Sequence, residues 1–279
     1  GQDNLIRVPI KGDWRGMDPQ ALESAIQSDL DAGLKPAGLI LCVGGTGTGA
    51  TDPIAECLAV AKKYGLYTHI DAAWAGSAMI CPEFRHYWEG VEEADSIVFN
   101  PHKWLGAQFD CSAHFVRDPE DLVKTLAISP EYLKTHGAEG IINYSEWSIP
   151  LGRRFRALKL WFLIRAYGLE GLRERLRNHV TWSQNLHDKL AAHPDFEIVT
   201  KPMWSLWTFR FVPNSSTGLD VLNQNLVNEI NDDGRIYLTQ TRVDGALVIR
   251  FQAGQFETTE DDVMMAYDVI TEIAERLTQ

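Results

Sequence analysis

His69-Ile70-Asp71-Ala72-Ala73 and Asn100-Pro101-His102-Lys103-Trp104 are the two stretches from which we infer the fold of this chain. Each lies at the end of a short apolar segment rich in β-forming residues, 66–70 for the first and 96–99 for the second. In open α/β sheets the carboxyl ends of the strands meet at one edge, which is where ligands bind. We therefore expect Asp71 and Lys103 to face one ligand site.

A lysine and an acidic residue in this arrangement suit pyridoxal phosphate (PLP). This cofactor needs a lysine amine that holds its aldehyde as an imine, and an acidic partner for its ring nitrogen. We interpret Lys103 and Asp71 as these residues, with Ala72 and Ala73 leaving room for a flat ring. An isolated lysine is more often a solvated surface charge, and an isolated aspartate more often a turn cap. Their shared position after strands favours the site.

The composition points to an ordinary globular protein that binds a small molecule. The 279 residues are 45% hydrophobic, enough for one large domain or two smaller ones. The formal charge of −12 disfavours binding to nucleic acid or to an anionic membrane. The four cysteines form no Cys-x-x-Cys pair, so neither a metal site nor a disulfide framework is expected and reduced, cytoplasmic thiols are the default. No run of about 18 apolar residues and no secretory signal is present.

Helical and extended patterns alternate from residue 18 to about 116, which predicts βα units. Asp52 is the expected N-cap of the second helix, with Pro53 at its first position. Gly168 is expected to break a long helical region, and a second α+β pattern follows it. The predicted helices are 19–30, 53–64, 155–167, 169–190, 219–231 and 259–277. The predicted strands are 5–10, 37–43, 67–70, 96–99, 111–116, 196–199, 206–211, 236–241 and 246–251.

The run Gly44-Gly45-Thr46-Gly47-Thr48-Gly49 joins a predicted strand to a predicted helix, so its backbone could approach a ring or an anion closely. It lacks the Gly-Lys-Ser/Thr ending of a P-loop and the full spacing of a dinucleotide fingerprint. By itself it is about as typical of a tight structural turn as of a ligand loop.

Taken together, these motifs resemble one family, the group II PLP-dependent amino-acid decarboxylases, and within it the aromatic-L-amino-acid decarboxylases. The likeness runs nearly end to end and rests on five motifs in order, at residues 69–78, 81–86, 100–104, 109–113 and 149–156. The resemblance implies an α/β, PLP-dependent transferase-like fold (aspartate aminotransferase-like, fold type I). Residues 1–168 would form the carboxyl-terminal portion of the large PLP-binding domain, and residues 169–279 the small α+β domain.

The resemblance also implies roles for individual residues. Lys103 would carry the imine, and Asp71 would bind the pyridine nitrogen. Tyr132 matches the tyrosine of the family's mobile loop, which is implied to protonate the carbanion after carbon dioxide leaves. The remaining implied positions are Ala73 packed on the ring, Thr46 near the phenolic oxygen, and Asn100 and His102 near the phosphate and the imine.

Two implications concern other parts of the protein. Family chains extend upstream, so Gly1 would begin inside a domain and this chain would be a fragment that needs the upstream half of the same protein. The family is also dimeric, so a homodimer is expected. Both partners would contribute to the substrate pocket.

The expected function is decarboxylation of an L-amino acid, aromatic by resemblance, although a non-aromatic substrate such as diaminobutyrate stays open. One alternative is another fold-type-I PLP reaction, of the aminotransferase or desulfurase kind. A transaminase should hold the substrate carboxylate with an arginine, and Arg250 and Arg210 are the strand-borne candidates in the second domain. The other alternative is a catalytically incomplete fragment.

Overall fold

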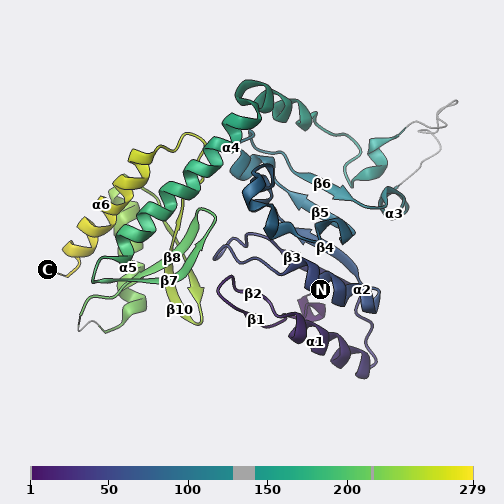
Figure 1. Ribbon diagram of the computed structural model, residues 1–279, viewed down its shortest axis with the longest axis horizontal. Coiled ribbons are helices and arrows are strands. Elements are labelled where there is room, and N and C mark those ends of the chain that lie inside the picture. Colours follow the sequence, from purple (N-terminus) through teal and green to yellow (C-terminus); the bar gives the residue numbers. More distant parts are fainter. Residues whose placement is uncertain (1, 128–141, 215–216, 279) are drawn as a thin grey trace.

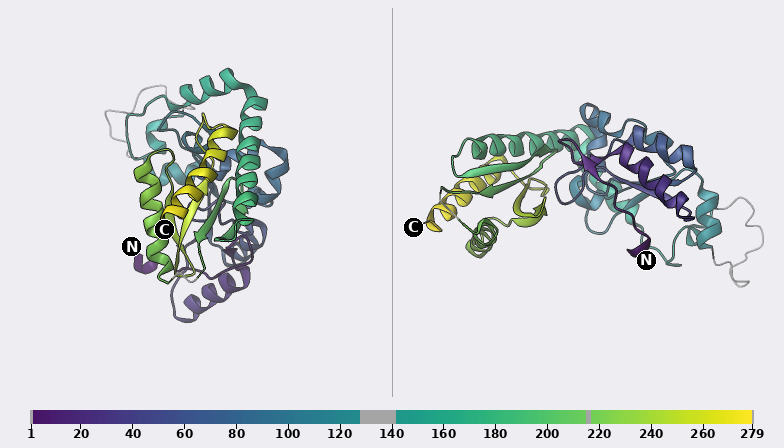
Figure 2. Two further views of the ribbon diagram at one scale, coloured as in Figure 1. Left: turned by 90° about the vertical axis from the view of Figure 1, so that its left-hand side faces the viewer. Right: turned by 90° about the horizontal axis from the view of Figure 1, so that it is seen from below.

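The computed structural model describes residues 2–127, 142–214 and 217–278. Two lobes, each built around a four-stranded sheet, are bridged by the long helix α4 (Arg156–Ala191) (Figure 1). Two further views show α4 running from one lobe into the other (Figure 2).

The sheet of the first lobe has the order β3-β4-β5-β6. The strands β3, β4 and β5 are parallel, whereas β6 pairs antiparallel with β5. Apolar side chains of this sheet, such as Leu41 and Ile70, pack with those of helices α1 and α2 in a buried core. The bounds are β3 Gly38–Cys42, β4 Tyr67–Asp71, β5 Ser96–Phe99, β6 Ala113–Val116, α1 Pro19–Asp31 and α2 Ile54–Tyr64. The βα units predicted from the sequence are confirmed.

The start of α2 corrects one prediction. Pro53, not Asp52, is the N-cap residue, and its side chain makes no capping hydrogen bond. The Asp52 carboxylate instead accepts hydrogen bonds from the backbone N–H groups of Met17 and Cys42, both at 2.7 Å. Asp52 therefore ties the segment before α1 to the end of β3, because its carboxylate is engaged by two part-buried N–H donors instead of the helix end.

The long helix confirms the predicted break at Gly168, whose φ of 67° and ψ of 172° are not helical. Glycine is the residue that enters this left-handed region without steric cost. The division of the chain into domains at this position stays a prediction. Side chains of the second lobe, including Met203, Trp204 and Leu206, pack in the core of the first lobe.

The second lobe contains an antiparallel sheet with the order β7-β8-β10-β9, packed with α4, α5 and α6 around its own core. Its elements are β7 Phe196–Met203, β8 Leu206–Phe211, α5 Leu219–Asp233, β9 Thr239–Val243, β10 Ala246–Gln252 and α6 Glu260–Arg276. The strand β9 begins three residues later than predicted. Asp244 and Gly245 form a two-residue turn with positive φ at both positions, which pairs Val243 with Ala246 and so sets the register.

The predicted strand 5–10 is wrong. Only Ile10 at its end belongs to a strand, in the small hairpin of β1 (Ile10–Lys11) and β2 (Gly16–Met17). The side chains of Leu5 and Ile6 are exposed, so the segment has no buried face to hold it in a sheet. Helix α3 (Pro119–Leu126), with Asp118 as its N-cap, was not predicted. Short helical turns complete the fold at Gln2–Asn4, Ala75–Ile80, Pro82–Trp88, Val91–Glu93, Pro101–Leu105 and Tyr144–Trp147.

Candidate active site

The two stretches that carry Asp71 and Lys103 meet at the carboxyl edge of the first sheet. Asp71 is the last residue of β4, and Lys103 lies in the turn Pro101–Leu105 that follows β5; we call this the lysine turn. The Asn100 N–H donates to the Ala73 carbonyl at 2.9 Å, and the Lys103 N–H donates to the Asn100 carbonyl at 2.9 Å. Backbone hydrogen bonds therefore hold the two stretches in one fixed arrangement.

The charges of Asp71 and Lys103 both act on the thiol of Cys42. Burial, and then the carboxylates of Asp71 and Asp52, raise the pKa of the Cys42 thiol to about 12, while the charge of Lys103 opposes them. Both Asp71 and Lys103 are exposed, and an Asp71 oxygen accepts a hydrogen bond from the Ala73 N–H at 3.0 Å. An acid and an amine are thus brought within electrostatic reach of one thiol.

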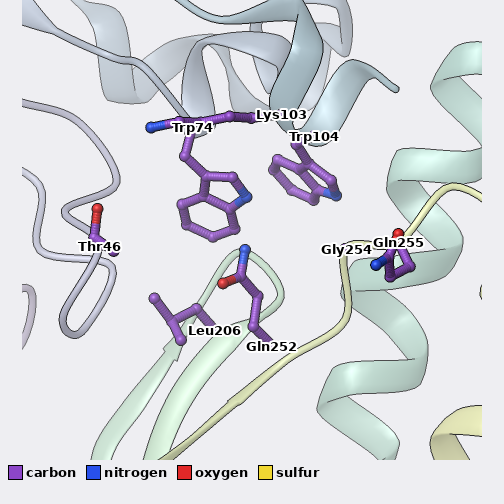
Figure 3. A pocket seen from close by; sticks show the side chains of 8 residues that line it. All are labelled: Thr46, Trp74, Lys103, Trp104, Leu206, Gln252, Gly254 and Gln255. Atoms are coloured by element: carbon purple, nitrogen blue, oxygen red, sulfur yellow. The ribbon is translucent and has the colours of Figure 1, made fainter. Parts of the chain in front are cut away.

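A cavity of about 380 Å³ lies between the two lobes at this edge. Its size falls within the usual range of about 300–1,000 Å³ for small-molecule sites. Of the residues expected from the sequence, Lys103 and Thr46 line it. The complete lining is Thr46, Trp74, Lys103, Trp104, Leu206, Gln252, Gly254 and Gln255 (Figure 3). The second lobe thus supplies half of the wall.

The glycine-rich loop forms one wall of this cavity through Thr46. Gly44 has a φ of +78°, and a Cβ atom there would lie 2.3 Å from the Cβ of Ala75 and 3.0 Å from Cε3 of Trp74. The loop therefore needs glycine both for its backbone conformation and for close packing against the segment after Asp71. The tight-turn and ligand-loop interpretations are not exclusive, since the tight turn brings Thr46 to the cavity.

The other predicted site residues have different surroundings. Nδ1 of His102 lies 3.0 Å from the Cys111 nitrogen and 2.7 Å from the Cys111 oxygen, so this ring is fixed against backbone and does not line the cavity. The side-chain oxygen of Asn100 is buried and has no hydrogen-bond partner among the described residues. Ala73 is half-buried. Tyr132 lies outside the described residues.

The sequence interpretation missed Trp74 and Trp104, which line the cavity as a stacked pair with ring centroids 5.0 Å apart. Their positions beside Ala73 and Lys103 were a usable signal. It also missed Gln252 and Gln255. Gln252 ends the apolar strand β10 and Gln255 lies in the glycine-containing run that follows it, and this pattern could have revealed both.

The two arginines considered as a substrate clamp are engaged elsewhere. Arg250 donates to the Gly47 carbonyl at 3.0 Å and to the Thr239 hydroxyl at 2.6 Å, and it does not line the cavity. Arg210 donates to Asp220 at 2.8 Å. Arg250 therefore connects the glycine-rich loop to the second sheet instead of pointing into the space beside Lys103.

Other kinds of site receive no support from the described residues. No group of three or more His, Cys, Asp or Glu side chains among them is arranged to hold a metal ion. None of their helices combines the length and apolarity that crossing a membrane requires. Burial raises the pKa of all four free thiols, Cys42, Cys57, Cys81 and Cys111. The reactive groups of this region are thus Lys103 and Asp71.

Comparisons with known proteins match nearly the whole chain. Residues 4–212 match the family model described as the pyridoxal-dependent decarboxylase conserved domain. The chain is 40% identical to tryptophan decarboxylase TDC1 of Camptotheca acuminata, over 98% of this chain and 56% of the relative. The chain thus spans about half the length of that relative.

Two solved structures show the same fold. One is Oryza sativa TDC with PLP and tryptamine, at a TM-score of 0.95 and 35% identity, over 100% of this chain and 59% of that one. The other is 4-hydroxyphenylacetaldehyde synthase of Rhodiola rosea, at a TM-score of 0.91 and 34% identity, over 100% of this chain and 58% of that one. The α/β, PLP-dependent transferase-like fold expected from the sequence is confirmed.

Proposed function

Because this chain belongs to the family of pyridoxal-dependent decarboxylases, we propose that the whole protein decarboxylates an aromatic L-amino acid to its amine and carbon dioxide. The observation that carries the proposal is the placement of Asp71 at the end of β4 and of Lys103 in the turn after β5, at the sheet edge beside a cavity that Lys103 lines. An acid and an amine on adjacent strand ends are the two groups that PLP requires.

The residues present fit PLP. Lys103 would hold the cofactor covalently, and Asp71 would pair with its ring nitrogen. Thr46 would lie beside the ring, and the half-buried Ala73 offers a small side chain against which a flat ring can pack. The buried, unpartnered side-chain oxygen of Asn100 supports a polar ligand group nearby, because buried polar atoms normally have partners.

When bound, PLP supplies an electron sink for the electron pair that the departing carboxylate leaves behind. The negative charge of Asp71 would favour the protonated form of the ring nitrogen, since an opposite charge nearby stabilises the charged form. Lys103 would anchor the cofactor until the substrate amine takes its place. His102 keeps its proposed place near the imine and phosphate, and Tyr132 its proposed role as the proton donor that completes the amine.

The alternative of transamination is disfavoured by the arginines. A transaminase would hold the substrate carboxylate with an unengaged guanidinium, whereas the guanidinium groups of Arg250 and Arg210 are hydrogen-bonded to other groups of this chain and neither arginine lines the cavity. A second outcome, oxidative formation of an aldehyde, is raised by the likeness to an aldehyde synthase. A tyrosine at position 132 favours simple decarboxylation, because it would protonate the carbanion.

We also propose that the active protein is a cytoplasmic homodimer in which the upstream half of the protein completes the site. Large apolar side chains around the start of α4 are exposed in this chain, including Phe109 at 76%, Ile149 at 88% and Phe155 at 75%. Exposed apolar surface of this extent supports a covering segment or partner. The four free thiols are consistent with a reducing compartment.

The test is a product assay of the full-length protein that contains this chain, with PLP and L-tryptophan, L-tyrosine or L-dopa. We expect carbon dioxide and amine in equal amounts, without aldehyde or hydrogen peroxide. Aldehyde with peroxide would replace the proposal by oxidative decarboxylation, and a keto acid without carbon dioxide would replace it by transamination. If none of the three amino acids gives a product, the proposed activity is wrong and a non-catalytic role remains for the protein.

A further inference from the structure

The lysine turn is held from one side by helix α4. Lys103 has a φ of −94° and a ψ of −114°, which are not helical, inside an otherwise helical turn. The direction of its side chain therefore depends on the residues that fix the backbone after it. These are Trp104 and Leu105, both buried.

Arg175 of α4 fixes the backbone of the lysine turn. Its Nη2 donates to the Trp104 carbonyl at 2.7 Å and to the Leu105 carbonyl at 2.8 Å. The guanidinium lies over the ring of Phe256 at 4.3 Å, and burial lowers its pKa to about 10. Arg175 thus stays charged at neutral pH, and its charged guanidinium donates hydrogen bonds to two backbone carbonyls of the turn.

His179, one helical turn further along α4, fixes the side chain that follows Lys103. Nδ1 of this fully buried ring accepts a hydrogen bond from Nε1–H of Trp104 at 3.0 Å. An indole nitrogen only donates, so Nδ1 must be unprotonated. Burial keeps the ring neutral by lowering its pKa to about 4. Trp104 then stacks on Trp74 in the cavity wall (Figure 3).

We propose that Arg175 and His179 are positioning residues that set the direction of Lys103, by holding Trp104 through its carbonyl and its indole. The inference rests on the proposed function for its significance, but not for its geometry. Neither residue lines the cavity, so both act through the lysine turn.

The test measures the reactivity of Lys103 in the full-length protein. PLP is added at limiting concentration with cyanoborohydride, and adduct formation at Lys103 is followed by peptide mass mapping. Lys62, which is 80% exposed and far along the chain from the turn, serves as an internal reference. In parallel, trace acetylation of cofactor-free protein reports the reactivity of the Lys103 amine without PLP.

For His179→Leu we expect adduct formation at Lys103 to slow about tenfold, the loss typical when a buried donor loses its acceptor. His179→Asn retains an acceptor oxygen near the place of Nδ1 and should stay within about threefold of the unmodified protein. Arg175→Lys keeps the charge but loses the planar guanidinium, which lies over Phe256 while its Nη2 reaches both carbonyls, and should also lose about tenfold. His187→Leu is the matched control, because that ring lies on the same helix but against Trp207, and it should change nothing.

Three results would overturn the proposal. Unchanged Lys103 reactivity in both His179→Leu and Arg175→Lys would show that the lysine turn keeps its conformation without these two side chains. Equal losses in His179→Asn and His179→Leu, or in His187→Leu, would indicate general destabilisation. If His179→Leu does not fold, the comparison of Arg175→Lys with His179→Asn tests the proposal, which requires a loss of Lys103 reactivity in the first variant and not in the second. Absence of any PLP adduct in the unmodified protein would instead remove the proposed function, while the acetylation measurement would still test the positioning.

Discussion

Gly44→Ala should destabilise the protein and open the cavity wall at Thr46. A non-glycine residue in the left-handed region costs about 1–2 kcal/mol, and Gly44 has a φ of +78°. The added Cβ would also lie 2.3 Å from the Cβ of Ala75 and 3.0 Å from Cε3 of Trp74. Overpacking of this kind costs about 1–3 kcal/mol. The free energy of unfolding should therefore fall by about 2–5 kcal/mol.

Gly33→Ala separates the two contributions. Gly33 has nearly the same φ, +76°, but a Cβ atom there would meet nothing within 4 Å. Denaturant unfolding should show a loss of only about 1–2 kcal/mol for Gly33→Ala, with PLP capture at Lys103 unchanged. Gly44→Ala should lose more stability and capture PLP more slowly. Equal stability and equal capture in the two variants would refute the close packing of the loop against the segment after Asp71.

Three further predictions follow from single residues. Lys103→Ala should abolish covalent PLP capture while changing the free energy of unfolding by no more than about 0.5 kcal/mol, since the side chain is exposed; capture that persists in the variant would contradict the assignment. Asp52→Ala should lower the free energy of unfolding by about 2–4 kcal/mol, because the N–H groups of Met17 and Cys42 would lose their acceptor. A decrease of less than about 0.5 kcal/mol in denaturant unfolding would disprove this role of Asp52. Alkylation of Cys42 by iodoacetamide at pH 8 should be about 1,000-fold slower than for an ordinary thiol, because the Cys42 pKa of about 12 leaves little thiolate. The alkylation rate should keep rising with pH up to about 11. A plateau of the rate near pH 9 would contradict the raised pKa.

Much of the first lobe was predictable because its signals are local. The strands β4 and β5 lie where the strand pattern indicated, with Asp71 at the end of β4 and Lys103 in the turn after β5. Thr46, in the glycine-rich run between a strand and a helix, lines the cavity; its place near the phenolic oxygen stays a prediction. In these segments a buried strand ends at a polar residue, and one window of sequence contains both signals.

The errors came from interactions between distant parts of the chain. Asp52 looked like a helix cap, yet its partners are Met17, 35 residues upstream, and Cys42. The β9 register follows from the turn at Asp244, which the strand pattern alone does not fix. The contribution of Gln252 and Gln255 to the cavity depends on how the second lobe packs on the first. A local pattern of hydrophobic residues in the sequence contains no information about that packing.

The most direct measurement is borohydride reduction of the full-length protein after incubation with PLP, followed by mass mapping of every lysine. We predict one stoichiometric pyridoxyl adduct, on Lys103, that is lost in Lys103→Ala and prevented when an aromatic L-amino acid is added before reduction. A stoichiometric adduct on any other lysine, or none at all, would contradict the assignment of Lys103 as the residue that holds the cofactor.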